Sequence, residues 1–147
     1  MSERVFVPDD FVAPIEFAGP GFRLEPLGPQ HNVSDHAAWS GSIEYIRATA
    51  EMGNWPPVEG LSLEKNLADL DRHAADFAAR RGFTYTVLEP GTSTVIGCVY
   101  IYPAKEAEYD ARLNTWVRAD RAELDEVLHR TVVDWISTWP LGTLRHR

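Results

Sequence analysis

Short stretches of alternating or continuous apolar residues along this chain predict the strands of one sheet. Residues 22–27 alternate apolar and polar side chains, and residues 83–103 form two β-branched and aromatic runs around Pro90-Gly91. The first pattern predicts a strand and the second a β-hairpin, since Pro-Gly favours a type II turn. Both faces of the second hairpin run are apolar, as is typical of a strand in the middle of a covered sheet. Residues 112–118 predict another strand, and 143–147 a short last one.

Helical spacing of apolar residues predicts three helices between these strands. The first covers about 34–53, with Ser34 as its N-cap and a weak point at Gly41. The second is capped by Ser62 and ends before Gly82, which would be the glycine just past its end. Its inward face would consist of Leu63, Leu67, Leu70, Ala74, Phe77 and Ala78. The third covers about 124–139, with Leu124, Val127, Leu128, Thr131, Trp135 and Trp139 inward.

The order of these elements is β, α, α, β, β, β, α, β. It predicts an α+β, three-layer architecture: a mixed, mostly antiparallel sheet with helices on both faces. Residues 1–20 contain several prolines and glycines, so we interpret them as an extended arm, with 21–147 as a single domain. A sheet that ends at the 143–147 strand has an open edge, which favours cover by the arm or by a second subunit in a homodimer.

Composition narrows the class of protein. The chain has 147 residues and a net charge of −8, which argues against nucleic acid as a partner because phosphate binding needs clustered Lys and Arg. The sequence has one cysteine, Cys98, inside an apolar run, which indicates a buried thiol. No stretch has the pattern of a signal peptide or membrane span, so we expect a cytoplasmic protein without a membrane partner. The histidines show no metal-ligand spacing, and no metal site is predicted.

The segments "VIGCVYIYP" and "WVRADRAEL", within this order of elements, resemble the GCN5-related N-acetyltransferase (GNAT) superfamily over about 22–147. In that family an acyl-CoA lies in a gap beside the strand that corresponds to 112–118. The resemblance implies acetyl-CoA as the cofactor. It places the cofactor groove at Asn114, Thr115, Trp116, Val117 and Arg118, with Arg121 as a flanking cation.

The resemblance also implies a pocket for the acceptor substrate. Glu25, Glu51, Trp55 and Glu59 fall where the family places the wall of that pocket. Tyr100 and Tyr102 share one face of a central strand and could line it, although aromatic residues there can equally belong to the core.

The segment after Val117 departs from the family pattern. The family has glycines there, which let the backbone wrap a diphosphate, but here those positions fall near Glu123 and Asp125. These carboxylates would repel a diphosphate. Asp120 and Glu123 also stand at capping-box spacing, which predicts that the helix satisfies its own first amides. Arg118 and Arg121 could contact CoA or pair with neighbouring carboxylates.

Three functions remain open on this basis. The first is a degenerate GNAT-like protein with weak or lost acyl-CoA transfer that binds a small ligand or a partner. The alternative is an active acyl-CoA-dependent N-acetyltransferase acting on a small amine, and the third is an unrelated α+β binding domain. The strand at 112–118 has no acidic residue to act as a base, and relative to the family pattern the chain is truncated before the later helix that supplies a catalytic tyrosine. No catalytic residue is assigned.

Overall fold

The computed structural model describes residues 6–147, which form one six-stranded sheet with helices on both faces. The strands are β1 (Phe17–Gly19), β2 (Phe22–Pro26), β3 (Phe83–Leu88), β4 (Val95–Pro103), β5 (Ala111–Val117) and β6 (Leu144–Arg145). The helices are α1 (Asn32–Ser40), α2 (Ile43–Thr49), α3 (Leu63–Ala78) and α4 (Asp125–Ile136), with 3-10 turns η1 (Pro29–His31) and η2 (Ala119–Leu124). The predicted α+β class and the predicted mixed sheet are confirmed.

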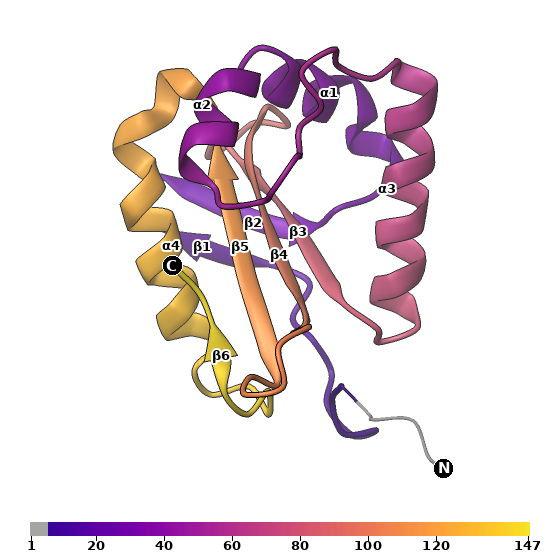
Figure 1. The fold of residues 1–147 in the computed structure, drawn as a ribbon, viewed down its shortest axis with the longest axis vertical. Helices are drawn as coiled ribbons and strands as arrows, with labels where there is room; N and C mark the ends of the chain where they lie inside the picture. Colours follow the sequence, from indigo (N-terminus) through magenta and orange to yellow (C-terminus); the bar gives the residue numbers. More distant parts are fainter. Residues whose placement is uncertain (1–5) are drawn as a thin grey trace.

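The strands lie in chain order, from β1 to β6. Neighbours from β1 to β5 are antiparallel, whereas β5 and β6 are parallel. Helix α4 packs on β5 from one face, while α1 and α3 pack on β4 and β3 from the other. Figure 1 shows α3 and α4 on opposite sides of the sheet, with α1 and α2 near the end of β5. No helix within residues 6–147 is long and apolar enough to cross a membrane.

The side chains of β5 alternate between these two layers, as a strand requires. Leu113 and Val117 belong to the core beneath α4, whereas Trp116 belongs to the core beneath α1. Arg112 and Asn114 share the face of Trp116 and line the cavity described below. The alternation therefore divides the predicted cofactor residues of β5 between the two faces of the sheet.

The start of the chain differs from the predicted arm. Residues Phe17–Gly19 form an edge strand that pairs with β2, so the sheet begins one strand earlier than the sequence predicts. Its three residues, next to Pro20 and Gly21, are too few to show an alternating pattern. Before it, Phe6 and Phe11 pack against the core, and Arg80 donates to the carbonyls of Pro8 and Phe11.

The first predicted helix is divided at Gly41 into α1 and α2. Ser34 lies inside α1 and is not its N-cap, because the turn η1, which begins with a proline, starts the helix instead. The Ser34 hydroxyl oxygen accepts a hydrogen bond from the Val95 amide (2.8 Å). The prediction of this cap was wrong, since the side chain fixes the start of β4.

Helix α3 begins at the predicted cap: the Ser62 hydroxyl oxygen accepts from the Lys65 amide at 3.1 Å. It ends earlier than predicted, and Arg80 takes the left-handed conformation (φ 63°) that had been assigned to Gly82. Gly82 is needed for space instead, because a Cβ there would lie 2.3 Å from the Tyr102 ring. The predicted inward face is also wrong in part: Leu63 and Leu67 are 45% and 37% exposed, and Asn66 is buried instead.

Candidate functional site

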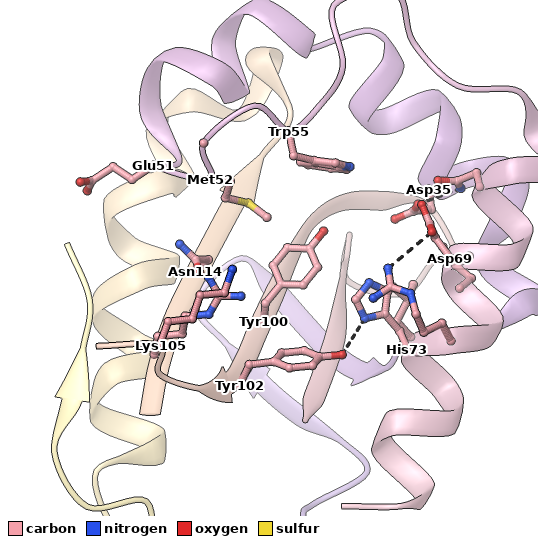
Figure 2. Close-up of a pocket in the computed structure, with 16 residues that line it drawn as sticks. Asp35, Glu51, Met52, Trp55, Asp69, His73, Tyr100, Tyr102, Lys105 and Asn114 are labelled. Carbon is pink, nitrogen blue, oxygen red and sulfur yellow. Dashed lines mark hydrogen bonds and ion pairs between the residues drawn. The ribbon is translucent and has the colours of Figure 1, made fainter. Parts of the chain in front are cut away.

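A cavity with a volume of about 470 Å³ lies on the α1–α3 side of the sheet. Its size is typical of a site for a small molecule. The cavity is lined by Leu27, Asp35, Glu51, Met52, Gly53, Trp55, Asn66, Asp69, Leu70, Arg72, His73, Tyr100, Tyr102, Lys105, Arg112 and Asn114. Figure 2 shows Tyr100 in the middle, with Asn114 and Lys105 toward one end and Asp35, Asp69 and His73 toward the other.

Aromatic rings form one wall of the cavity. The Trp55 ring lies 5.5 Å from that of Trp39, 6.0 Å from Trp116 and 6.4 Å from Tyr100. Trp39 and Trp116 are buried and pack against Trp55, whose own ring lines the cavity. Stacked or tilted rings at these distances provide a flat apolar surface with little freedom to move.

A buried hydrogen-bond network holds α1 against α3 at one end of the cavity. The side chain of Asn66, 3% exposed, accepts from Trp39 Nε1 (3.0 Å) and donates to Asp35 Oδ2 (3.1 Å) and Asn32 Oδ1 (2.8 Å). Burial raises the pKa of Asp35 to about 6, although the hydrogen bond from Asn66 works in the opposite direction. Asp35 is therefore a carboxyl group that changes charge near neutral pH.

A second network joins α3 to the hairpin. His73 Nδ1 lies 2.9 Å from both Tyr102 Oη and Thr84 Oγ1, and the Tyr102 hydroxyl donates to Asp76 Oδ2 (2.8 Å). Burial lowers the pKa of His73 to about 4, so its imidazole is neutral at pH 7. Burial also raises the pKa of Tyr102 to about 12. Both groups are neutral and fixed in orientation at the cavity wall.

Two of the residues predicted for the acceptor pocket line this cavity from the strand β4, Tyr100 and Tyr102, and Trp55 lines it from the loop after α2. Glu51 lines it as well, whereas Glu59 lines a separate hollow with Ser40 and Lys65. Glu25 lies elsewhere on β2, where its carboxylate binds Arg23 (2.8 Å) and His31 (2.7 Å). Glu25 is not among the residues that line this cavity.

The predicted cofactor residues do not share one surface. Asn114 lines the cavity, but Thr115, Trp116 and Val117 are each 1% exposed, so their side chains belong to the core. The Thr115 hydroxyl lies 3.2 Å from His129 Nδ1 beneath α4. Burial lowers the pKa of His129 to about 4.

The connection from β5 to α4 does not contain the predicted capping box. Asp120 forms a two-point ion pair with the Arg118 guanidinium (2.9 and 2.7 Å) rather than accepting from a helix amide. The 3-10 turn η2 precedes α4, and Leu124, whose side chain cannot cap, is the N-cap residue. The prediction was wrong because the nearest strong donor to Asp120 is a guanidinium two residues away.

Other charged groups at this connection are also paired. Arg121 binds the Glu89 carboxylate, and Asp125 binds Arg147 through contacts of 2.5 and 3.1 Å. The Ala119 amide donates to the Ser42 hydroxyl oxygen (2.9 Å), and the Arg118 amide donates to the Ile96 carbonyl (2.9 Å). The connection therefore satisfies several of its charges and amides within the chain.

Several lining residues were missed by the sequence interpretation. Asn66, Asp69 and His73 lie on one face of α3, three to four residues apart. The spacing of these three polar residues could have predicted a polar face on the helix, but the interpretation considered only the spacing of apolar residues. No local sequence pattern predicts that Lys105 and Arg112 line the cavity. Arg112 reaches it because the pairing of β4 with β5 places this residue opposite Tyr102.

Comparisons with solved structures support the same fold. The structure of the ribosomal-protein-S5-alanine acetyltransferase from Vibrio fischeri matches 84% of this chain (TM-score 0.65, 10% identity, 67% of that chain). The microcin C7 self-immunity acetyltransferase MccE, in complex with acetyl-CoA and AMP, matches 83% of this chain (TM-score 0.62, 11% identity, 66% of that chain). An acetyltransferase from Thermus thermophilus matches 80% (TM-score 0.55, 18% identity, 71% of that chain).

The sequence itself matches no protein-family model and no curated protein. The chain spans about two thirds of the length of the microcin enzyme and of the Vibrio fischeri enzyme. At these identities the likeness establishes the fold alone. The chain has the fold of the GCN5-related N-acetyltransferases, which confirms the expected fold.

Proposed function

We propose that this protein is acetyltransferase-like in fold and binds a small molecule in the cavity beside Trp55 and Tyr100, with weak or lost acyl-CoA transfer. The observation that carries the proposal is the contrast between two places along β5. At its carboxyl end, charges and amides pair with one another. On its α1–α3 face, a cavity of about 470 Å³ keeps an aromatic wall and polar groups.

The β5–α4 connection fits a diphosphate poorly. A diphosphate needs donors and cations that are free to bind it. Here the Arg118 and Arg121 guanidinium groups already bind Asp120 and Glu89, and the Ala119 amide already binds Ser42. Asp125 adds negative charge at the first turn of α4, where a glycine is expected. Acyl-CoA would have to displace these ion pairs and overcome that charge.

Acetyl-CoA binding can be tested by isothermal titration calorimetry on the wild-type chain and on two matched double variants. Glu123→Gln with Asp125→Asn removes charge at the connection and releases Arg147. Glu64→Gln with Asp71→Asn makes the same charge change on the exposed face of α3. We expect no measurable binding by wild type below millimolar acetyl-CoA and a gain only in the first variant. Micromolar binding by wild type would reject the proposal.

The alternative is an active N-acetyltransferase that acts on a small amine. It is favoured by the structure of MccE with acetyl-CoA and AMP, which shows that a protein of this fold can hold both. Mass spectrometry of the protein incubated with acetyl-CoA and a pool of small amines would decide: acetylated amine above the rate without protein supports the alternative. A homodimer and a cytoplasmic location stay predictions, the first testable by light scattering.

A further inference from the structure

Arg112 differs from the other arginines in residues 6–147. Each of the others donates to a carboxylate or to a backbone carbonyl. The Arg112 side chain has no such partner among the described residues, and its Nε is buried without a hydrogen bond. A buried unsatisfied donor on a charged group is unfavourable unless a ligand or solvent completes it.

Lys105, in the loop between β4 and β5, lines the same cavity and likewise has no ion-pair partner within residues 6–147. The chain contains 22 acidic and 14 basic residues, so carboxylates are in surplus. Among the other ten arginines of residues 6–147, eight pair with a carboxylate, and Arg47 and Arg80 donate to backbone carbonyls. Glu51 also lines this cavity, but within residues 6–147 it forms no ion pair with Arg112 or Lys105, so both cations are available to an anionic group of a ligand.

Asn114 adds a neutral donor beside these cations. It stands two residues after Arg112 on the same face of β5, opposite Tyr100 on β4, as Arg112 stands opposite Tyr102. Its side-chain amide makes no hydrogen bond with another residue of the described chain. Figure 2 shows Asn114 and Lys105 at the same end of the cavity, across Tyr100 from the acidic end with Asp35 and Asp69.

This cluster is separate from the place where the resemblance puts the CoA diphosphate. Arg112 lies near the start of β5, and Arg118, six residues later, directly follows its end. At about 3.3 Å per residue, the two lie roughly 20 Å apart. An anion bound at Arg112 is thus part of a ligand in the cavity rather than the diphosphate at the α4 end.

We propose that Arg112, Lys105 and Asn114 bind the carboxylate or phosphate group of a small ligand whose flat apolar part rests against Trp55 and Tyr100. The guanidinium supplies a planar pair of donors, the ammonium supplies charge at the more exposed rim, and the amide supplies a directed N–H. This inference rests on the proposed function, because it names the class of ligand that the cavity takes.

Three small probes of similar shape test it: phenylacetate, phenyl phosphate and neutral phenylacetamide. Their binding to the ¹⁵N-labelled full chain is followed by NMR, using the Trp55 indole N–H and the Asn114 side-chain amide. A charge-assisted hydrogen bond predicts that an anionic probe binds about tenfold or more tightly than phenylacetamide. The carboxylate and phosphate arms then distinguish the two sources of the anion.

The variants Arg112→Gln and Lys105→Gln should each remove most of that preference. Arg130→Gln is the matched control, since it makes the same charge change at an exposed ion pair with Glu126 on α4. Arg112→Gln removes no protein hydrogen bond of its side chain, so its thermal midpoint should match wild type. That measurement separates lost binding from lost folding.

The other outcomes reject either the anion site alone or the anion site together with the proposed small-molecule function. Equal binding of phenylacetamide and the anions, with the Trp55 signal shifted, rejects the anion site while the small-molecule function stands. A preference that survives Arg112→Gln also rejects the anion site. Failure of all three probes to shift Trp55 or Asn114 rejects both this inference and the small-molecule part of the proposed function.

Discussion

The indole Nε1 of Trp116 donates a hydrogen bond to the Tyr100 hydroxyl oxygen, 2.9 Å away, across the neighbouring strands β5 and β4. Trp116 is 1% exposed, so its N–H cannot turn to water when the partner is lost. The Tyr100 side chain therefore accepts a hydrogen bond from the buried Trp116 N–H and also lines the cavity.

Replacing this phenol should destabilise the fold. Tyr100→Phe leaves Trp116 Nε1 unpaired, and we expect the free energy of unfolding to fall by about 1–3 kcal/mol. Urea denaturation followed by far-UV circular dichroism measures the change. Tyr109→Phe is the control, because the Tyr109 hydroxyl makes no hydrogen bond within residues 6–147. An equal effect of the two substitutions would contradict the role of this bond.

The amide of Asn66 should matter more, since it serves three partners. Asn66→Ala leaves Trp39 Nε1 and the Asp35 carboxylate without their shared partner inside the core. We expect a loss of about 2–4 kcal/mol in the free energy of unfolding, measured by urea denaturation. Asn114→Ala, which removes the same amide from a side chain without such partners, should cost less than about 1 kcal/mol. Similar losses would show that the network contributes little.

The charge of Asp35 should make stability depend on pH. Its folded pKa is about 6, above the ordinary value of 3.8 for an aspartate, so between those values the folded state binds more protons than the unfolded state. The contribution of Asp35 to stability therefore falls as pH rises from about 4 to about 6. Asp35→Asn removes the buried charge and should stabilise the protein at pH 7 by about 1–3 kcal/mol.

That advantage should disappear near pH 4, where Asp35 is protonated in the folded state. Urea denaturation of wild type and Asp35→Asn at pH 4, 5, 6 and 7 measures it. The opposite contribution comes from His73 and His129, whose folded pKa values of about 4 lie below the ordinary value of 6.5 for a histidine. Their contribution to stability increases as pH rises from about 4 to 6.5. Wild type and Asp35→Asn both contain these histidines, so the contribution cancels in the difference between the two. A difference that is constant with pH would refute the assignment.

Gly97 should be required for the close approach of β4 and β5. A Cβ at Gly97 would lie 2.5 Å from the Trp116 carbonyl oxygen, a backbone atom that cannot turn aside. Gly97→Ala should destabilise the fold by about 2–4 kcal/mol by separating the strands. Gly41→Ala is the control: Gly41 has φ −81° and a Cβ there lies 3.4 Å from its nearest neighbour. In thermal unfolding, the midpoint of Gly97→Ala should therefore lie below that of Gly41→Ala.

The order of elements could be predicted from the sequence because strands and helices differ in the spacing of their apolar residues and are bounded by recognisable turn and capping residues. Pro90-Gly91 placed the hairpin, and Ser62 placed the start of α3. The three-residue strand β1 and the division between α1 and α2 were less visible, since short elements depend on contacts from elsewhere in the chain. The helix face of α3 was misplaced because Asn66 and His73, although polar, face inward to hydrogen-bond partners.

The candidate site was harder to predict than the fold. Trp55, Tyr100 and Tyr102 were found because their rings stand out on a strand or in a loop. The unpaired state of Arg112 depends on where every carboxylate of the folded chain lies, which no local pattern contains. The capping role of Asp120 was wrong for the same reason, because the Arg118 guanidinium lies closer than the expected helix amide. Glu25 likewise has a partner that no local pattern shows, the imidazole of His31.

The division of one helix at Gly41 joins two places that a continuous helix would keep apart. Ser42 follows that break, and its hydroxyl oxygen holds the Ala119 amide just after β5. The helix that follows Ser42 leads into the loop that carries Trp55 over the cavity. The break therefore connects the loop that carries Trp55, through α2 and Ser42, to the backbone at the start of the β5–α4 connection.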